Sequence, residues 1–461
     1  MSGRIRPGAL ALVLHTHMPY VEGFGRWPFG EEWLWEAVAM SYLPLLGPLS
    51  RAPITLSLTP VLADQLEAPV AMERCLAFLQ EIRPESHARD IAEFRRAGET
   101  AFVAELERSA AEYAARAVEL DSLSASGGLL GRLGAAAGWT STATHAVLPL
   151  LATDRGVRLQ VETGIAAHRR RFGAWRGGLW LPECGHAPWL EPLLEAAGVR
   201  AACVELTRVF GLGDRRHLEP LRTAAGPVLW PIDRATMAHV WDNTGYPGHG
   251  AYRDYHRHTA HRHHVQANDG SPYEHRRALA QARADAADFV GRVRERVAGG
   301  GTCVVALDTE LLGHWWYEGV QWLAGVIDEA ALQGLALTTL DDALEVADPG
   351  LAPPGLGEST WGEGGDLRTW SGPGVADLAW RARTFELRAA QAGGECTPRA
   401  LRELLALQSS DWAFLITRAL AGDYPRERAQ RHAALLERAL AGEPLEPELR
   451  HLAPELVGWK G

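Results

Sequence analysis

Six short apolar runs, each stopped by a polar residue or a proline, constrain the fold of this chain more than any other feature of its sequence. The runs are GALALVLH, ITLSLTP, GGLWLPE, AACVEL, PVLWPID and TCVVALDTE. Continuous rather than alternating hydrophobicity is typical of strands that are buried on both faces, as in parallel sheets. Helical stretches such as CLAFLQEIRPE and DAADFVGRVRERV separate the runs. This alternation predicts a β/α barrel or an open, doubly wound sheet.

A barrel explains where the polar residues collect. The apolar runs end at or near His15, Pro60, Glu183, Glu205, Asp233 and Asp308. In a β/α barrel the active site lies at the carboxyl ends of the strands, which is where these side chains are expected. No GxGxxG motif opens a helix after a strand, so the dinucleotide-binding form of the open sheet has no support.

The composition narrows the class of function. The chain has 461 residues, of which 47% are hydrophobic and 22% charged, as in an ordinary globular protein. Its formal net charge of −11 argues against nucleic acid as a partner, because no phosphate-neutralising surface is expected. The sequence contains no CxxC pair and no apolar stretch of membrane-spanning length, and the N-terminal run ALALVL is too short for a secretion signal. We therefore expect a cytoplasmic protein that binds neither nucleic acid nor membrane.

Regions rich in glycine and proline divide the chain. We predict a catalytic barrel over residues 1–346 with an insertion around 235–295, a linker at 347–374 that contributes cleft residues, and a helical domain over 375–461. In the last region Thr397 followed by Pro398 is a typical helix start, with a capping hydroxyl and a proline in the first turn.

The segment 241–275 is dense in histidine, tyrosine, glycine and proline. Its histidines, at positions 256, 258, 261, 263 and 264, suggest either a metal site or a solvated loop. They lack an HExxH frame and a nearby acid at helical spacing, so we interpret the segment as a solvated loop.

Two acids at predicted strand ends form a candidate catalytic pair. Glu183 follows GGLWLP and Asp308 follows CVVAL, and each has tryptophans close by in the sequence. Two carboxyl groups that face one cleft suit the cleavage of a glycosidic bond, with one as nucleophile or base and the other as proton donor. Spacing alone does not establish the pair, because any β/α barrel has several acids at its strand ends.

The sequence HTHMP places two histidines at the end of the first predicted strand. Residues i and i+2 of a strand point to the same side, so His15 and His17 are both expected to face the cleft. One interpretation is a metal site, as in barrels that deacetylate polysaccharides. The other is hydrogen bonding to sugar hydroxyls, which we favour because no third metal ligand is evident.

Five motifs occur in a fixed order: HTHMPYVEGFGRWPFGEEWLWEA, WLPECGH, ALDTELLGHWWYEG, STWGEGGDLRTW and QSSDWAF. This series resembles the conserved regions of glycoside hydrolase family 57, most closely its 1,4-α-glucan branching enzymes, from about residue 8 to about residue 440. The resemblance implies an incomplete (β/α)7 barrel with a C-terminal helical domain. It also implies a retaining mechanism without a metal or another cofactor.

The resemblance assigns roles to individual residues. Glu183 in WLPEC matches the family nucleophile, and Asp308 in LDTE matches the general acid/base. His15 and His17 match a motif that contacts the sugar nearest the scissile bond. The other positions that match substrate-binding residues are Trp27, Trp33, Trp241, Trp361, Trp370 and Asp411. Core packing stays an alternative role for tryptophans, and a retaining mechanism implies carboxyl groups about 5 to 5.5 Å apart.

One loop departs from the branching members of the family, which carry a long loop with a tyrosine near its tip. Here the matching residues 207–226 are short, and Phe210 is their only aromatic side chain. Branching requires that water be kept from the reaction intermediate. We therefore expect a branching enzyme, with an α-glucan hydrolase or a 4-α-glucanotransferase as the alternative and a metal-dependent polysaccharide deacetylase as a further one. The expected partner is an α-1,4-glucan such as amylose or glycogen, and the expected assembly is a monomer or a small homo-oligomer.

Overall fold

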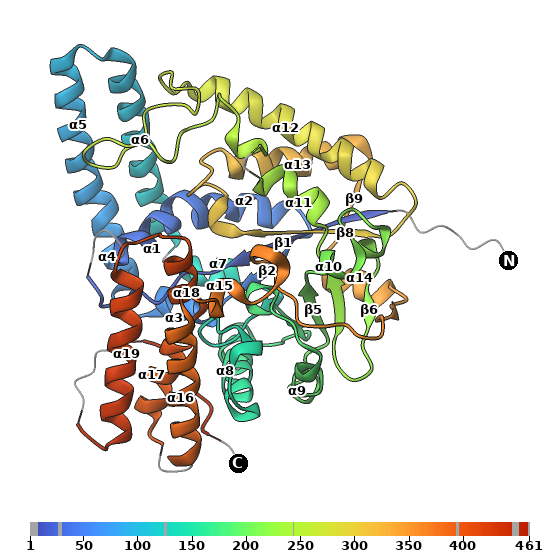
Figure 1. Ribbon diagram of the computed structural model, residues 1–461. Helices are drawn as coiled ribbons and strands as arrows, with labels where there is room; N and C mark the ends of the chain where they lie inside the picture. The colour runs from blue at the N-terminus through green and yellow to red at the C-terminus, as the bar shows by residue number, and fades with distance from the viewer. Residues whose placement is uncertain are drawn as a thin grey trace.

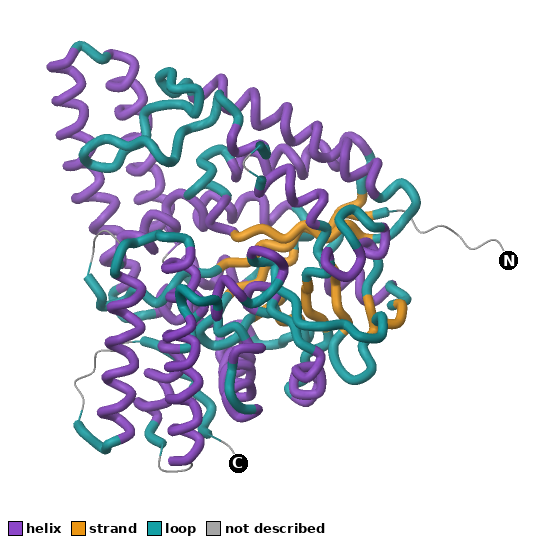
Figure 2. Tube along the Cα trace, viewed as in Figure 1, coloured by secondary structure: helices purple, strands orange, loops and turns teal. Residues whose placement is uncertain are grey.

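The computed structural model describes residues 8–25, 30–123, 127–242, 244–392, 396–444 and 451–459. Helices surround a central group of strands (Figure 1, Figure 2). The strands are β1 (Ala9–Thr16), β2 (Thr55–Leu58), β3 (Trp139–Thr140), β4 (Gly178–Leu179), β5 (Ala201–Val204), β6 (Leu221–Arg222), β7 (Val228–Pro231), β8 (Thr302–Asp308), β9 (Ala336–Leu337) and β10 (Gly350–Leu351).

The sheet has the topology of an incomplete barrel. Seven of the described strands are parallel and follow the order β8–β1–β2–β3–β4–β5–β7. β9 pairs with the first residues of β1, β6 pairs antiparallel with β7, and β10 pairs with β6. This confirms the incomplete (β/α)7 barrel that the resemblance implies.

All six apolar runs form strands of this sheet, namely β1, β2, β4, β5, β7 and β8. In β1 every residue from Leu10 to Thr16 is buried, and all residues of β2 and β5 are buried as well. In such a barrel the helices pack on the outer face of the strands and side chains fill the interior, so neither face of these strands meets water. The unbroken hydrophobicity of the runs follows from this burial.

β7 and β8 do not pair as strands within the described sheet, and contacts of Asp233 link the two sides instead. Asp233, which follows β7, donates its backbone N–H to the carbonyl of Val304 in β8 at 2.8 Å. Its fully buried carboxylate accepts hydrogen bonds from Arg296 Nε at 2.8 Å and from Thr236 Oγ1 at 3.0 Å. We call this contact the Asp233 seam. The acid at the end of the predicted strand PVLWPID therefore serves the closure of the barrel.

The α-helices are α1 (Glu31–Ala37), α2 (Leu43–Arg51), α3 (Pro60–Glu67), α4 (Ala71–Ala77), α5 (Arg83–Ala97), α6 (Thr100–Leu123), α7 (Gly128–Gly134), α8 (Asp154–Phe172), α9 (Glu191–Ala196), α10 (Thr207–Phe210), α11 (Arg234–Trp241), α12 (His275–Arg296), α13 (Gly319–Gln333), α14 (Leu340–Val346), α15 (Arg368–Ser371), α16 (Ala376–Ala392), α17 (Pro398–Leu407), α18 (Ser410–Thr417) and α19 (Tyr424–Leu440). None of the helices in the described ranges has the length and hydrophobicity needed to cross a membrane.

The C-terminal helices α16, α17 and α19 lie side by side at one end of the molecule (Figure 1). The predicted helix start is confirmed: the Thr397 hydroxyl accepts a hydrogen bond from the N–H of Ala400, and Pro398 is the first residue of α17. Glu386 of α16, fully buried, anchors this region by accepting hydrogen bonds from the N–H groups of Ala152 and Thr153. Within the predicted linker 347–374, β10 belongs to the sheet; the domain boundaries themselves stay a prediction.

The histidine-rich segment packs against the hairpin of α5 and α6, which projects from the barrel (Figure 1). Both oxygens of Asp90 in α5 are used, one by His261 Nδ1 and the other by His263 Nδ1, each at 2.6 Å. His263 is only 3% exposed, so the interpretation of a solvated loop is wrong for this residue. The sequence gives no sign of the contact because Asp90 lies about 170 positions away.

Asp90→Ala is expected to release this segment, because it leaves the buried His263 imidazole, the partly exposed His261 imidazole and the Thr259 hydroxyl without their acceptor. A buried polar group left without its partner costs about 1 to 3 kcal/mol. We expect a lower unfolding temperature and faster hydrogen exchange in residues 254–264. The matched control is Glu85→Ala, which removes an exposed ion pair with Arg89 from the same helix. Equal exchange in the two variants would contradict the prediction.

Candidate active site

The predicted catalytic residues lie at the carboxyl ends of strands. His15 is the next-to-last residue of β1. In the register of the two strands it lies opposite Asp308, the last residue of β8. Glu183 follows β4 by a few residues. Since parallel strands end on the same side of a sheet, these side chains share the edge where barrel active sites form.

Glu183 occupies a strained turn. Its φ of 62° and the φ of 51° at Cys184 fall in the left-handed region, which residues other than glycine rarely adopt. The turn is held from outside: Trp361 donates its backbone N–H to the Glu183 carbonyl at 3.0 Å, and His186 and Ser359 exchange two backbone hydrogen bonds. Backbone pairing with a distant segment therefore fixes the conformation of the Glu183 turn.

Each oxygen of the Glu183 carboxylate has its own hydrogen-bond donor. Trp361 Nε1 donates to Oε2 at 2.8 Å, and Ser410 Oγ donates to Oε1 at 3.0 Å. The side chain is 12% exposed. Burial raises the pKa of Glu183 to about 7, although both donors act in the opposite direction by stabilising the ionised form.

Asp308 has a different electrostatic environment. Burial raises its pKa well above the usual range, and the negative charges of Glu310 and Glu183 raise it further. Because an ionised Glu183 disfavours a second charge nearby, Asp308 keeps its proton while Glu183 is a carboxylate. One protonated and one ionised carboxyl group are the pair that a retaining glycosidase needs.

Glu310 is a third acid at this edge, and the sequence analysis did not single it out. Its Oε1 accepts hydrogen bonds from Tyr42 Oη at 2.6 Å and from the His17 N–H at 3.2 Å. Burial raises the Glu310 pKa to about 7. The available signal was its position two residues after Asp308 in LDTE, where a carboxylate is expected near the same cleft.

His15 and His17 both lie at this edge, as predicted, and every ring nitrogen has a protein partner. His15 contacts His145 Nε2 through Nε2 at 2.8 Å and Ser57 Oγ through Nδ1 at 3.4 Å. His17 contacts Asp411 Oδ1 through Nε2 at 2.9 Å and Thr59 Oγ1 through Nδ1 at 3.3 Å. Among the described residues, no group of three or more His, Cys, Asp or Glu side chains is arranged to hold a metal ion.

The two histidines differ in charge. Burial lowers the pKa of His15 well below its usual value, and the neighbouring His17 lowers it further. Burial also opposes protonation of His17, but the carboxylates of Asp411, Glu310 and Glu183 together outweigh it, with Asp411 contributing most, so the pKa of His17 is raised. His17 and Asp411 therefore form an ion pair between β1 and α18, which lie far apart in the chain.

His145 completes the group, and the sequence analysis did not identify it. Its ring stacks on His17 and His15 with centroids 4.0 Å and 4.8 Å away, and its φ of 59° is again left-handed. Its Nδ1 lies 2.8 Å from Ser410 Oγ and 3.7 Å from Glu183 Oε1. It follows β3, a strand of two residues, so no apolar run marked this strand end in the sequence.

The predicted tryptophans have diverse positions. Trp361 contacts Glu183, and its ring lies edge-on to Trp180 with centroids 5.1 Å apart. Trp33 and Trp241 are partly buried against the main core. Trp370, 2% exposed, belongs to a small apolar cluster with Val147 and others. Trp27 lies outside the described residues, and a substrate-binding role for any of these tryptophans stays a prediction.

The loop 207–226 presents no aromatic side chain at its surface in the described structure. Phe210, its only aromatic residue, is 8% exposed and packs in the core beside Leu206. The guanidinium of Arg216 covers the ring, with Cζ 4.4 Å from the centroid. The loop therefore has no ring with which to cover a bound glucan.

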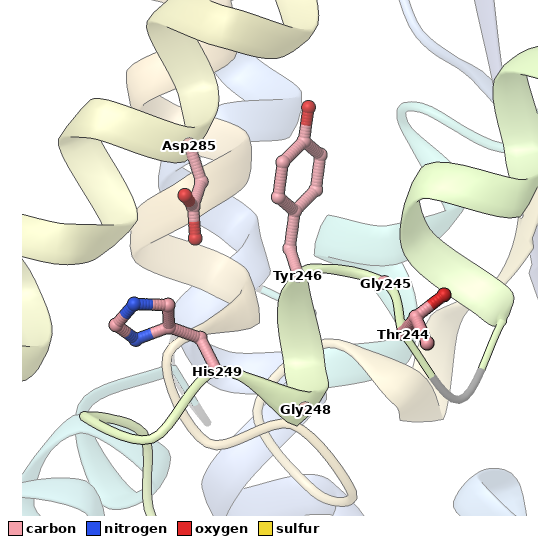
Figure 3. A pocket seen from close by; sticks show the side chains of 6 residues that line it. All are labelled: Thr244, Gly245, Tyr246, Gly248, His249 and Asp285. Atoms are coloured by element: carbon pink, nitrogen blue, oxygen red, sulfur yellow. The ribbon is translucent and has the colours of Figure 1, made fainter.

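A separate shallow pocket of about 200 Å³ lies just beyond Trp241 in the chain (Figure 3). Its lining residues are Thr244, Gly245, Tyr246, Gly248, His249 and Asp285. Neither catalytic acid is among them, and its tyrosine is hydrogen-bonded to Asp288 at 2.7 Å.

Comparison with known proteins agrees with this geometry. The family described as "Glycosyl hydrolase family 57" matches residues 136–350, and the family described as "1,4-alpha-glucan branching enzyme, C-terminal" matches residues 378–445. A Mycobacterium tuberculosis protein with the name "Probable 1,4-alpha-glucan branching enzyme" is 33% identical, over 93% of this chain and 90% of that protein. The chain belongs to glycosyl hydrolase family 57.

Two further family 57 relatives extend the comparison. The 1,4-alpha-glucan branching enzyme of Thermococcus kodakarensis is 30% identical, over 92% of this chain and 72% of that protein. The crystal structure of a GH57-type branching enzyme from Pyrococcus horikoshii superposes with a TM-score of 0.87 and 29% identity, covering 97% of this chain and 94% of that one. The similarity therefore includes the helices that follow the barrel as well as the barrel itself.

Asp411→Asn is expected to lower stability most at acidic to neutral pH. A raised His17 pKa stabilises the folded state fully below about 6.5, the unfolded value, and this contribution is lost as the pH rises through the folded pKa. Unfolding temperatures of the wild type and the variant, measured between pH 5.5 and 8.5, should therefore converge at the alkaline end.

The control for this pH series is Asp377→Asn, which removes an exposed ion pair with Arg426 within the C-terminal helices. The unfolding temperature of this control should differ from that of the wild type by a small and nearly constant amount over the same pH range. A constant difference for Asp411→Asn would contradict the assignment of an ion pair to His17.

Proposed function

We propose that this family 57 protein is a 1,4-α-glucan branching enzyme, which cleaves an α-1,4 link and transfers the released chain to a 6-hydroxyl group. The similarity to branching enzymes over more than nine-tenths of the chain carries the proposal. It includes the C-terminal region that is matched at 378–445, and that region brings Ser410 to Glu183 and Asp411 to His17.

In the first half-reaction Asp308 donates its proton to the glycosidic oxygen while Glu183 attacks the anomeric carbon. The bond from that carbon to the leaving oxygen breaks, the leaving chain departs with a new hydroxyl group, and a glycosyl–Glu183 ester remains. The raised pKa of Asp308 suits a proton donor, and the two hydrogen bonds to Glu183 favour its nucleophilic, ionised form.

In the second half-reaction Asp308, now ionised, accepts the proton of an incoming 6-hydroxyl group. The acceptor oxygen attacks the anomeric carbon, the ester breaks, and Glu183 returns to the carboxylate. Two inversions give net retention of the α configuration. If water replaces the glucan acceptor, the same steps give hydrolysis.

Hydrolysis is the second candidate function because of the loop 207–226. Its only ring, Phe210, is buried under Arg216 instead of lying at the surface. With no ring from this loop over the intermediate, we expect a measurable share of glycosyl groups to pass to water.

Amylose treatment followed by debranching should reveal both products. We expect new short chains released by a debranching enzyme to exceed new reducing ends, since transfer creates no net reducing end and hydrolysis creates one. Glu183→Gln should abolish both transfer and hydrolysis, and Asp308→Asn should slow each of them by at least about a thousandfold. Reducing ends without branch points would favour the hydrolase, and full activity of Glu183→Gln would exclude it as nucleophile.

The pH profile of kcat/KM should be bell-shaped, with the midpoint of its acidic limb near pH 7. Glu183, with a pKa of about 7, must be ionised to attack, so activity rises as the pH increases through that value. The alkaline limb reflects loss of the proton from Asp308. Trp361→Phe removes one donor to Glu183 and should move the acidic limb to higher pH, whereas Trp380→Phe, in an exposed position on α16, should not.

We also propose a cytoplasmic location, which the five cysteines support because all are free and buried in the described structure. The substrate class that we propose is an α-1,4-glucan such as amylose or glycogen. A monomer or small homo-oligomer stays a prediction.

A further inference from the structure

A continuous series of hydrogen bonds links β2 to the Glu183 carboxylate. Ser57 Oγ lies 3.4 Å from His15 Nδ1, and His15 Nε2 lies 2.8 Å from His145 Nε2. His145 Nδ1 lies 2.8 Å from Ser410 Oγ, which lies 3.0 Å from Glu183 Oε1. Four segments that are distant in sequence thus meet in one line that ends at the carboxylate.

The hydrogen-bonding capacity of each group determines the direction of the series. A carboxylate only accepts, so the single proton of the Ser410 hydroxyl must point to Glu183. His145 must then donate to Ser410 from Nδ1, which leaves its Nε2 as an acceptor for the Nε2–H of His15. His15 Nδ1 in turn accepts from the Ser57 hydroxyl. Every donor in the series therefore points toward the carboxylate.

This direction requires one proton on each imidazole ring. Burial lowers the pKa of both His15 and His145 well below the usual value, and the charge of His17 adds to the effect, so both rings are neutral. A neutral ring has one donor and one acceptor, which is what the series needs at each histidine.

We propose that Ser410 is a positioning residue for the nucleophile: as the last member of the series Ser57–His15–His145–Ser410, it fixes one carboxylate oxygen of Glu183 and selects its ionised form. The inference rests on the proposed function, in which Glu183 attacks the sugar. Ser410 is only 4% exposed, so it acts through Glu183 and not by touching the glucan.

Backbone contacts hold Ser410 in place. Its N–H donates to the carbonyl of His145 at 3.1 Å, and the preceding Ser409 forms a bridge with Ala146. Stacking of His15 on Trp180, with centroids 4.6 Å apart, fixes the middle of the series. Because Trp361 holds the other carboxylate oxygen, rotation of the Glu183 carboxylate would break two hydrogen bonds at once.

Four other titratable groups influence Glu183 and belong in any interpretation of its pH dependence. His145 Nδ1 lies 3.7 Å from Oε1, and the charges of Asp411 and His17 shift the pKa of Glu183 in opposite directions. Asp308 interacts with Glu183 from the end of β8. Removal of the Ser410 hydroxyl leaves these four groups in place, so its effect on Glu183 can be measured separately.

The test compares Ser410→Ala and Ser410→Thr with the wild type. For Ser410→Ala we expect kcat/KM on amylose to fall about tenfold, mainly in kcat, and the acidic limb to rise by about one pH unit. Ser410→Thr keeps the hydroxyl group and should restore most of kcat/KM and most of the wild-type position of the acidic limb. The control Ser371→Ala removes a hydroxyl at the end of α15 that donates to the carbonyl of Leu367, the residue before that helix, and should leave both the rate and the pH profile unchanged.

A 4-nitrophenyl α-maltooligosaccharide distinguishes a defect in the nucleophile Glu183 from a defect in the proton donor Asp308. Its activated leaving group needs little protonation, so it depends little on Asp308. The loss in Ser410→Ala should persist with this substrate, whereas the loss in Asp308→Asn should shrink in the first half-reaction. A wild-type rate and pH profile for Ser410→Ala, or a folded Ser410→Thr as impaired as the alanine variant, would overturn the inference.

A titration that needs no turnover distinguishes this inference from the proposed function. Infrared difference spectra between each protein and its Glu183→Gln derivative report the carboxyl band of Glu183. The pKa of Glu183 should be higher in Ser410→Ala than in the wild type, and an unchanged pKa would overturn the inference. Absence of activity on amylose in the wild type would instead contradict the proposed function.

Discussion

A carboxylate that is taken out of water must be given hydrogen-bond donors, and this requirement at Glu183 organises the whole site. The barrel strands do not supply those donors to it. They come from Trp361, which follows the sheet in the chain, and from Ser410, in the first turn of α18. Without either one of them, a nearly buried charge would have an unpaired oxygen, which costs several kcal/mol. The barrel therefore presents Glu183, and the later segments make its charged form stable.

The same segments also control the backbone at Glu183. Glu183 and Cys184 are held in left-handed conformations, and the pairing of the Glu183 turn with the residues around Ser359 and Trp361 opposes their relaxation. His145, also left-handed, receives the N–H of Ser410 on its carbonyl. Strain at the strand ends is thus compensated by contacts from outside the barrel, and side-chain and backbone bonds from the same segments act together.

The sequence predicts those parts of the fold and site that depend on local pattern. Long apolar runs identify β1 and β8, and therefore His15 and Asp308 at their ends. The seven-stranded barrel and the role of Glu183 depended on the resemblance, because β4 is short and its acid looks like any strand-end acid.

Residues recruited by tertiary contact escaped the sequence analysis. His145 follows a strand of two residues, too short to show a hydrophobic pattern. Ser410 meets Glu183 across 227 positions, and an ordinary serine in a helical region carries no sign of that contact. Phe210 illustrates the converse, since it is the only aromatic residue of its loop and yet it is buried, with Arg216 covering the ring. Only the packed chain reveals such pairings.

The Asp233 seam has a consequence for how this barrel can vary. Glu183, Asp308, the histidines beside them and Ser57 stand on or just after β8, β1, β2, β3 and β4, whereas the loop 207–226 leaves β5 and returns through β6 to β7, on the seam side. β6 pairs only with β7 and β10 within the described sheet, so insertions or deletions before it do not shift the register of the strands that carry the acids. The loop 207–226 can therefore change in length while the strands that carry Glu183 and Asp308 keep their register.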